Sequence, residues 1–219
     1  FFNRSFLDPA IKGTFPEDLV LLLKELDYLP EYTQSELELI KHNTIDILGI
    51  NYYQPRRIMK KESTERLSDK QMPDDYFDNY IWPERKMNPY RGWEIYEKGI
   101  YDCLINVRDN YGNLPCFISE NGMGVEGEER FVNADGMIED DYRIEFVQDH
   151  LKYVHQALQE RCNVKGYHMW TCMDNWSWTN AYKNRYGFIA VDLTQEGKRT
   201  IKKSGYWFKE VSDNNGFDA

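Results

Sequence analysis

Three short apolar strands separated by two amphipathic helices constrain the fold of this chain more than any other feature. Strands are predicted at 46–53, 115–120 and 164–171, where apolar runs lack the polar alternation of a strand with one solvated face. Between them, apolar residues recur at helical spacing over 92–111 and 140–162. This alternation is typical of right-handed β-α-β units, so the sequence predicts an α/β fold with a parallel sheet.

The remaining segments indicate that this sheet is incomplete. A hairpin is predicted from 186–193 and 199–203, followed by a helix over 204–211. Segment 58–88 is charged, contains proline and lacks periodicity, so we expect a long excursion at the mouth of a barrel. A parallel barrel needs eight strands and roughly 250 residues, so three strands cannot close one. We therefore expect the back portion of a larger domain.

The second predicted strand ends on a carboxylate at a sharp turn. Apolar Cys116, Phe117 and Ile118 lead to Glu120, and Asn121-Gly122 then stops the strand. Barrel enzymes place their chemistry at the carboxyl ends of their strands. Taken alone, Glu120 is equally compatible with a helix cap or a turn acid.

Composition narrows the class of protein. A net charge of −10 and a pI near 5.0 argue against nucleic acid as a partner, and no apolar run is long enough for a membrane span. The 6 Trp and 16 Tyr exceed the needs of a core, and such rings line carbohydrate grooves. Four cysteines without metal-ligand spacing indicate reduced core residues and a cytoplasmic location. His150 and His155 point apart on one helix, and we expect no metal and no cofactor.

Five segments, in order, resemble glycoside hydrolase family 1, the retaining β-glycosidases. Residues 118–122 (Ile-Ser-Glu-Asn-Gly) resemble the nucleophile motif, and the other matching segments are 6–16, 49–53, 92–96 and 170–187. The resemblance covers nearly the whole chain, whereas enzymes of the family are roughly twice as long. It implies that residues 1–219 are the C-terminal half of one (β/α)8 TIM barrel domain, with strands six to eight and their helices.

The resemblance assigns catalytic roles to strand ends. It implies that Glu120 is the nucleophile, one of two carboxylates that retaining enzymes hold about 5–5.5 Å apart. Tyr53 is similar to the family's tyrosine that donates a hydrogen bond to the nucleophile, although a packed rim aromatic is the alternative. Asn51 shares the strand face of Tyr53 and is expected in the same polar cluster. The acid/base motif Asn-Glu-Pro is absent, so the isolated chain is expected to be inactive.

Three tryptophans resemble sugar-binding residues of the family. Trp170 resembles the platform on which the glycone ring stacks, and Trp178 the donor whose indole N–H reaches a glycone hydroxyl. Trp93 resembles the wall on the aglycone side. A core role for Trp170 or Trp178, and a helix-start anchor for Trp93, are the alternatives.

Position 177 bears on substrate choice. Family members that cleave unphosphorylated glucosides carry Glu there, whereas this chain has Ser177. A carboxylate repels a phosphate dianion, and a hydroxyl can donate to it. Ser177, Lys183 and Tyr186 together resemble the phosphate clamp of the 6-phospho-β-glycosidases. In some members the lysine stands one place later, where this chain has Asn184, so a solvated loop charge is the alternative for Lys183.

The leading hypothesis is therefore the C-terminal half of a cytoplasmic 6-phospho-β-glucosidase. Its substrates would be phosphorylated β-glucosides such as cellobiose 6-phosphate or aryl glucoside 6-phosphates, hydrolysed with retention of configuration. A 6-phospho-β-galactosidase, an unphosphorylated β-glucosidase and a non-catalytic fragment or assembly partner remain alternatives. The implied partner is the missing N-terminal half of the barrel, and exposed strand edges predict that the isolated chain self-associates.

Overall fold

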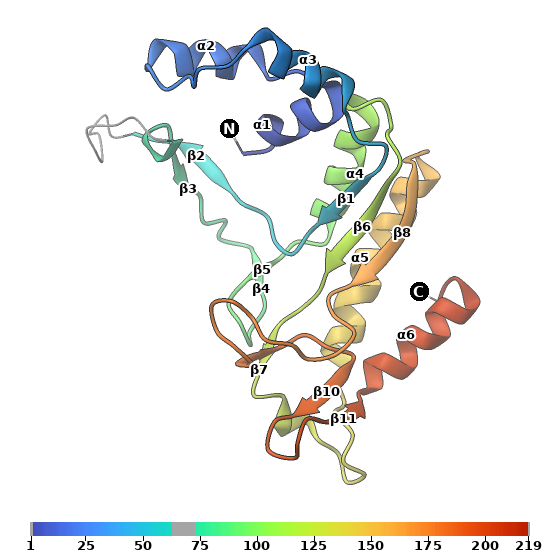
Figure 1. Cartoon of the computed structure of the whole chain (residues 1–219). Helices are drawn as coiled ribbons and strands as arrows, with labels where there is room; N and C mark the ends of the chain where they lie inside the picture. Colours follow the sequence, from blue (N-terminus) through green and yellow to red (C-terminus); the bar gives the residue numbers. More distant parts are fainter. Residues whose placement is uncertain (1, 63–72, 219) are drawn as a thin grey trace. The chain divides into compact units, whose positions relative to one another are not determined.

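The structure, a computed structural model, describes residues 2–62 and 73–218, which fall into two compact units (Figure 1). The first unit comprises Phe1–Leu48 and Arg56–Pro83, and the second Gly49–Pro55 and Glu84–Ala219. All candidate site residues lie in the second unit. That residues 1–219 belong to one larger domain stays a prediction.

The first unit consists of short helices and a small hairpin. The capping box of α3 is formed by Thr33, which accepts from the Glu36 amide and whose own amide donates to the Glu36 carboxylate. The helical elements are α1 (Arg4–Leu7), η1 (Asp8–Lys12), α2 (Glu17–Glu25), α3 (Gln34–His42) and η2 (Pro73–Asp75), and the hairpin pairs β2 (Ile58–Lys60) with β3 (Phe77–Asn79).

Segment 58–88 is more ordered than the expected loop. Besides the β2–β3 hairpin, it contains β4 (Lys86–Met87), which pairs with β5 (Glu94–Ile95). Its residues 63–72 lie outside the described part of the chain. The paired strands are only two or three residues long, so their sequences are too short to show a periodic pattern.

The second unit contains the predicted parallel sheet. Its strands are β1 (Leu48–Asn51), β6 (Cys116–Asn121) and β8 (Val164–Met169), in the order β1-β6-β8. Strand β6 pairs in parallel with β8, and all three arrows run in the same direction (Figure 1). Each strand lies within or one residue beyond its predicted range, so the strand positions are confirmed.

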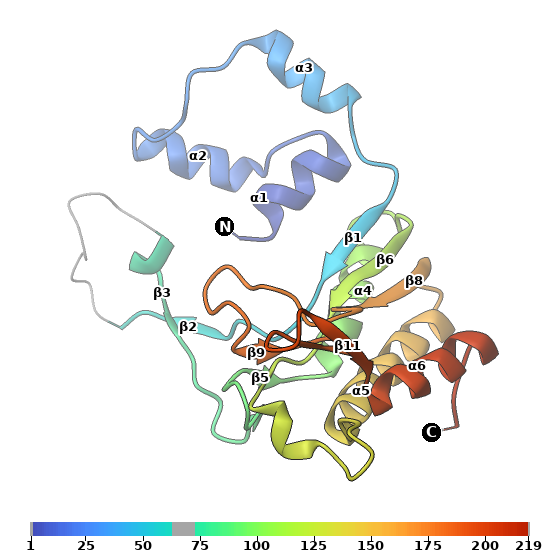
Figure 2. The same ribbon diagram turned by 60° about the horizontal axis from the view of Figure 1, so that its bottom comes forward.

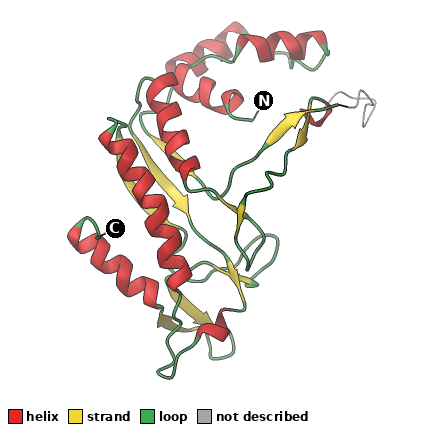
Figure 3. Ribbon diagram, turned by 180° about the vertical axis from the view of Figure 1, so that it is seen from behind, coloured by secondary structure: helices red, strands yellow, loops and turns green. Residues whose placement is uncertain are grey.

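The helices cover one face of this sheet, as Figure 3 shows from behind. Helix α4 (Lys98–Asn110) buries Ile100 and Leu104, and α5 (Asp141–Gln159) packs beside it. On β6, Ile118 is fully buried, whereas Phe117 on the opposite face is only half-buried. The expectation of a strand buried on both faces is therefore wrong for this chain, because helices cover one side alone.

The helix predicted over 92–111 begins later than expected. Gly92 adopts a φ of +83°, and β5 follows it, so helical geometry starts only at Lys98. The predicted C-terminal elements are present: β10 (Ile189–Asp192) and β11 (Lys198–Ile201) form a hairpin that leads into α6 (Lys203–Asn214) (Figure 2). Shorter elements are β7 (Val125–Glu126), η3 (Glu128–Phe131) and β9 (Asn184–Arg185).

The cysteines and histidines lie in different environments. Cys116 and Cys162 are buried and Cys103 is half-buried, but Cys172 is exposed, so the expectation of four core thiols is wrong at that position. Over residues 2–62 and 73–218, no three His, Cys, Asp or Glu side chains gather to hold a metal ion. Within the same ranges no helix is long and apolar enough to cross a membrane.

Burial makes His150 sensitive to acid. Its Nδ1 lies 2.7 Å from the Phe146 carbonyl oxygen, and its Nε2 is buried without a partner among the described residues. Burial lowers the pKa of His150 to about 4, from 6.5 in an unfolded chain. Between these values the unfolded chain binds a proton that the folded chain excludes. His150 therefore disfavours folding progressively as the pH falls from 6.5 to 4.

We predict that lowering the pH from 7 to 4 costs the folded chain about 3 kcal/mol more than it costs the variant His150→Gln. Urea unfolding at several pH values measures this difference. His155→Gln is the matched control, because His155 is exposed on the same helix and its removal should leave the slope unchanged. An identical pH dependence for the chain and His150→Gln would contradict the account.

Candidate active site

The carboxyl ends of the three strands are joined at the end of β6. The Glu120 carbonyl accepts from the Tyr52 amide at 2.8 Å, and the Asn121 carbonyl accepts from the Trp170 amide at 2.8 Å. The fully buried Asn121 side chain reinforces both links: its Nδ2 donates to the Tyr52 carbonyl, and its Oδ1 accepts from the Tyr167 hydroxyl, each at 2.7 Å. The residues that follow β1 and β8 therefore lie beside Glu120.

A tyrosine is bonded to the candidate nucleophile. The Tyr53 hydroxyl donates to Glu120 Oε2 at 2.5 Å, and the edge of the Tyr53 ring meets Trp93, with 5.8 Å between ring centroids. Burial, together with the Glu120 carboxylate, raises the pKa of Tyr53. The phenol therefore stays protonated and acts as a donor, so the structure brings together Tyr53, Glu120 and Trp93.

Asn51 lies on the same sheet but has a different partner. Its Oδ1 accepts from the Ser119 hydroxyl at 2.7 Å, and the Asn51 side chain is exposed. In the described ranges, Asn51 has no hydrogen bond to Glu120 or Tyr53. The residues of the expected polar cluster are thus bonded as two separate pairs, Asn51 with Ser119 and Tyr53 with Glu120.

Trp170 lies directly against the turn that follows β6. A Cβ atom added to Gly122 would come within 2.0 Å of the Trp170 carbonyl oxygen, so only glycine fits there. The Trp170–Thr171 peptide is cis, and the Trp170 side chain is half-buried. This close approach holds Trp170 next to the end of β6 and leaves its ring partly open to solvent.

Ser177 and Trp178 belong to a tight turn. The Ser177 amide donates to the Ala181 carbonyl at 2.9 Å, and the Ala181 amide donates back at 3.0 Å. Trp178 is 91% exposed, and its ring lies edge-to-face with the Trp176 ring, with 5.5 Å between centroids. Trp178 is therefore not part of the core of this chain, and within the described ranges no contact joins it to Glu120.

The two other members of the expected phosphate clamp, Lys183 and Tyr186, differ in burial. Lys183 is exposed, and its Nζ lies 3.4 Å from Glu126 Oε2. Tyr186 is buried, which raises the pKa of its phenol. Asn184 is buried in β9, paired with Glu126 of β7, so it does not replace the lysine.

Sequence reasoning missed a buried cluster of charges behind this region. Arg143 on α5 bonds the carboxylates of Glu128 and Asp140, and Lys202 bonds Glu128 and Asp174. All five side chains are at least 95% buried. Desolvation lowers the pKa of Lys202, whereas the two carboxylates outweigh desolvation and raise the pKa of Arg143. Removing one partner of such a buried pair costs about 3–5 kcal/mol.

This charge cluster also ties the site's loops together. Arg143 donates to the Met123 carbonyl at 2.5 Å and to the Tyr186 carbonyl at 3.1 Å. The segment after Glu120 is thereby linked to the segment that carries Tyr186. Arg143, a charged residue at helical spacing from the apolar Val147, was a sequence signal that could have indicated this cluster.

Sequence reasoning also did not predict the role of the loop before Trp93. Asn88 is buried, its amide donates to the Trp93 carbonyl at 2.8 Å, and its Nδ2 donates to the Gly124 carbonyl at 2.9 Å. The guanidinium carbon of Arg91 lies 3.6 Å from the centroid of the Trp93 ring. The loop therefore places a cation beside the group formed by Trp93, Tyr53 and Glu120.

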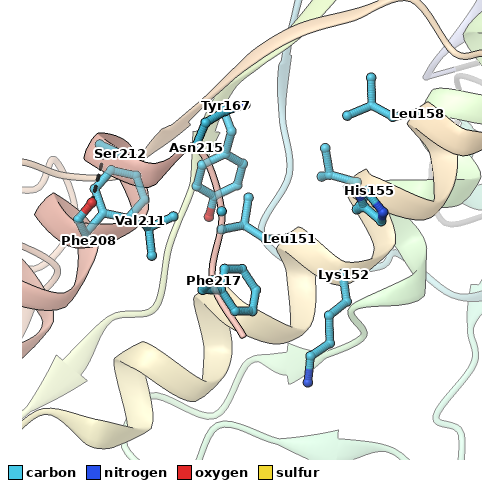
Figure 4. A pocket seen from close by; sticks show the side chains of 12 residues that line it. Leu151, Lys152, His155, Leu158, Tyr167, Phe208, Val211, Ser212, Asn215 and Phe217 are labelled. Atoms are coloured by element: carbon cyan, nitrogen blue, oxygen red, sulfur yellow. Dashed lines mark hydrogen bonds between the residues drawn. The ribbon is translucent and has the colours of Figure 1, made fainter. Parts of the chain in front are cut away.

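A cavity of about 560 Å³ lies elsewhere, between β8, α5 and α6 (Figure 4). Leu151 and Phe217 face each other across it, and His155 and Lys152 stand along α5. It contains none of the residues that the sequence assigns to the site. This cavity is a crevice between helices on the covered face of the sheet.

Comparison with known proteins gives a consistent result over the whole chain. The profile of glycosyl hydrolase family 1 matches residues 1–217. The chain is 64% identical to the 6-phospho-beta-glucosidase GmuD of Bacillus subtilis, covering 99% of the chain and 47% of that protein. It is 33% identical to a 6-phospho-beta-galactosidase of Clostridium acetobutylicum, covering 96% and 46%.

Comparison with solved structures points to the same family. A family 1 β-glucosidase from Thermotoga maritima superposes with a TM-score of 0.80 at 31% identity, covering 99% of the chain and 44% of that structure. The chain thus spans about half the length of the proteins it matches.

We predict that Gly122→Ala destabilises the fold by at least about 2 kcal/mol, because the added methyl group meets the Trp170 carbonyl. Gly166→Ala is the matched control: Gly166 lies on neighbouring β8, where an added Cβ meets nothing within 4 Å, so its effect should stay within about 0.5 kcal/mol. Urea unfolding compares the two variants. Equal stabilities would show that β6 and β8 do not approach as described.

Proposed function

The chain belongs to glycosyl hydrolase family 1, and on that premise we propose that the complete protein hydrolyses 6-phospho-β-glucosides with retention of configuration. The observation that carries this proposal is the 2.5 Å hydrogen bond from Tyr53 to the Glu120 carboxylate at the strand ends. A carboxylate held in this way is aimed by its neighbour and can serve as a nucleophile.

Glu120 performs the first step of the proposed reaction. Tyr53 occupies Oε2, and in the described ranges Oε1 accepts no hydrogen bond, which leaves Oε1 to attack the anomeric carbon. The carbon–oxygen bond to the aglycone breaks as the ester bond to Glu120 forms. Water then hydrolyses the glycosyl-enzyme, and two inversions give net retention.

Protonation of the departing oxygen comes from outside this chain. No Asn-Glu-Pro motif occurs in it, and general-acid assistance is worth about 10²–10⁴ in rate. We propose that residues 1–219 are the C-terminal half of a (β/α)8 barrel in which β1, β6 and β8 are strands six to eight. The half-buried face around Phe117 and Ser119 would then line the barrel interior, and the isolated chain is expected to be inactive and to self-associate.

The sugar-binding roles follow from the positions of the aromatic residues. Trp170, partly open beside β6, offers an apolar face for the glycone ring. Trp93, in contact with Tyr53, would form the aglycone wall. The exposed indole of Trp178 is free to donate to a glycone hydroxyl. Asn51, bonded to Ser119, would contribute to the rim of this pocket.

The phosphate preference rests on position 177 and on the relative at 64% identity. Ser177 is neutral where a glutamate would repel the dianion, and Tyr186 supplies a phenol whose raised pKa keeps it a donor. Phosphorylated sugars are intracellular compounds, and four free thiols fit a reducing compartment, so we propose a cytoplasmic location.

The test compares kcat/KM of the complete protein for an aryl β-glucoside and for its 6-phosphate. We predict a preference for the phosphate of about a hundredfold or more, near 2.7 kcal/mol of transition-state discrimination. Ser177→Glu should abolish that preference. Thr179→Glu is the control, since it adds the same charge at an exposed position of the same turn and should largely retain the preference.

Three other results would redirect the assignment. Equal rates for the two glucosides, or faster cleavage of the plain one, would identify an ordinary β-glucosidase. A higher kcat/KM for the galacto 6-phosphate would identify a 6-phospho-β-galactosidase. Absence of turnover of all three compounds by the complete protein would leave the non-catalytic alternative.

A further inference from the structure

Arg91 carries a charge that no described residue neutralises. Its side chain makes no ion pair or hydrogen bond within residues 2–62 and 73–218, and its Nε is buried and unbonded. The other arginines in the interior of the second unit are paired: Arg143 with two carboxylates, and Arg185 with Asp174 at 3.8 Å. A half-buried cation without a counter-charge is costly, so Arg91 can gain free energy by binding an anion.

The position of Arg91 connects the nucleophile to Tyr186. Its guanidinium carbon lies 3.6 Å from the Trp93 ring centroid and 5.7 Å from that of Tyr186. Trp93 in turn contacts Tyr53, which bonds Glu120. The cation is therefore separated from the candidate nucleophile by only two aromatic rings.

Gly124 allows the arginine and the phenol to meet. A Cβ on Gly124 would come within 2.7 Å of the Tyr186 hydroxyl oxygen and within 2.9 Å of Arg91 Cδ. Both groups are thus close to one point that a side chain would occupy. Since the terminal nitrogens of Arg91 are neither bonded nor among the buried unpaired atoms, they reach solvent and can receive a ligand.

The loop that carries Arg91 is fixed by its own hydrogen bonds. Asn88 bonds the Trp93 carbonyl and the Gly124 carbonyl, and the Gly92 amide donates to the Asn88 carbonyl at 2.8 Å. A positive φ of 83° at Gly92 completes this turn. Arg91 is therefore presented by a defined turn whose geometry does not depend on its own charge.

We infer that Arg91 is the cation that binds the phosphate group of the substrate, with the Tyr186 hydroxyl as a second donor; this inference rests on the proposed function. A planar guanidinium can bond two phosphate oxygens at once, and stacking on Trp93 holds it in orientation. Lys183, the cation expected from the sequence, is exposed and already lies 3.4 Å from Glu126. Arg91 is therefore a specificity-determining residue, and Lys183 has a secondary role.

The experiment measures kcat/KM of the complete protein and its Arg91→Met variant on an aryl β-glucoside 6-phosphate and on the plain glucoside. We expect a loss of at least thirtyfold on the phosphate and less than threefold on the glucoside. Inorganic phosphate, as a competitive inhibitor, should bind at least tenfold more weakly to the variant. Arg130→Met is the matched control, because Arg130 also stacks on two rings, Tyr90 and Phe131, and its removal should change neither ratio.

The outcomes separate this inference from the proposed function. If the unaltered protein shows no preference for the phosphate, both are wrong. If it shows the preference and Arg91→Met retains it, only the role of Arg91 is wrong. Equal losses on both substrates would mean that Arg91 merely supports Trp93, which also overturns the inference. Should Arg91→Met fail to fold, Arg91→Lys replaces it in the test. An unchanged KM of this variant for the phosphorylated glucoside contradicts the role of Arg91. A raised KM for the phosphorylated glucoside, with an unchanged kcat on the plain glucoside, supports it.

Discussion

The hydrogen bonds at the end of β6 are the constraint on which the candidate site depends. Two successive backbone carbonyls, of Glu120 and Asn121, accept from the strands on either side, and the buried Asn121 side chain bonds the same neighbours. A buried polar group left unpaired costs about 1–3 kcal/mol, so these contacts strongly favour a single register. Because Tyr53 directly follows the bonded Tyr52 and Trp170 is itself bonded, their positions beside Glu120 are consequences of that register.

Buried ion pairs also hold the loops of the candidate site in place. The buried cluster built on Arg143 and Lys202 joins the loop after β6 to the segment around Tyr186, and its carboxylates neutralise both cations. Arg91 stands in contrast, since its charge lacks such a counter-ion within the described residues. The buried, paired charges of this unit thus support the frame, whereas we propose that Arg91, half-buried and without an ion pair among the described residues, marks the place where a substrate anion fits.

Sequence patterns predicted the strands and helices because apolar periodicity reflects burial directly. They misplaced the start of α4, where the turn at Gly92 depends on hydrogen bonds from Asn88. Apolar periodicity also does not predict that the polar side chains of Arg143 and His150 are buried on α5, or that Leu158 is 43% exposed. The burial of a charged side chain can be predicted only when its partners, which lie far away in the sequence, are known. The pairing of Tyr53 with Glu120 was foreseen through family resemblance, whereas the significance of Arg91 depends on its approach to Gly124.

The central claim is that Glu120 attacks the anomeric carbon of a phosphorylated glucoside. The most direct measurement is to treat the complete protein with 2-deoxy-2-fluoro-β-glucosyl fluoride 6-phosphate, which slows hydrolysis of a glycosyl-enzyme, and to locate the label by peptide mass spectrometry. The account predicts one sugar phosphate per chain, on the peptide that contains Glu120, and none on the Glu120→Gln variant. A label on another residue, or turnover of ordinary substrate by Glu120→Gln at the unaltered rate, would contradict it.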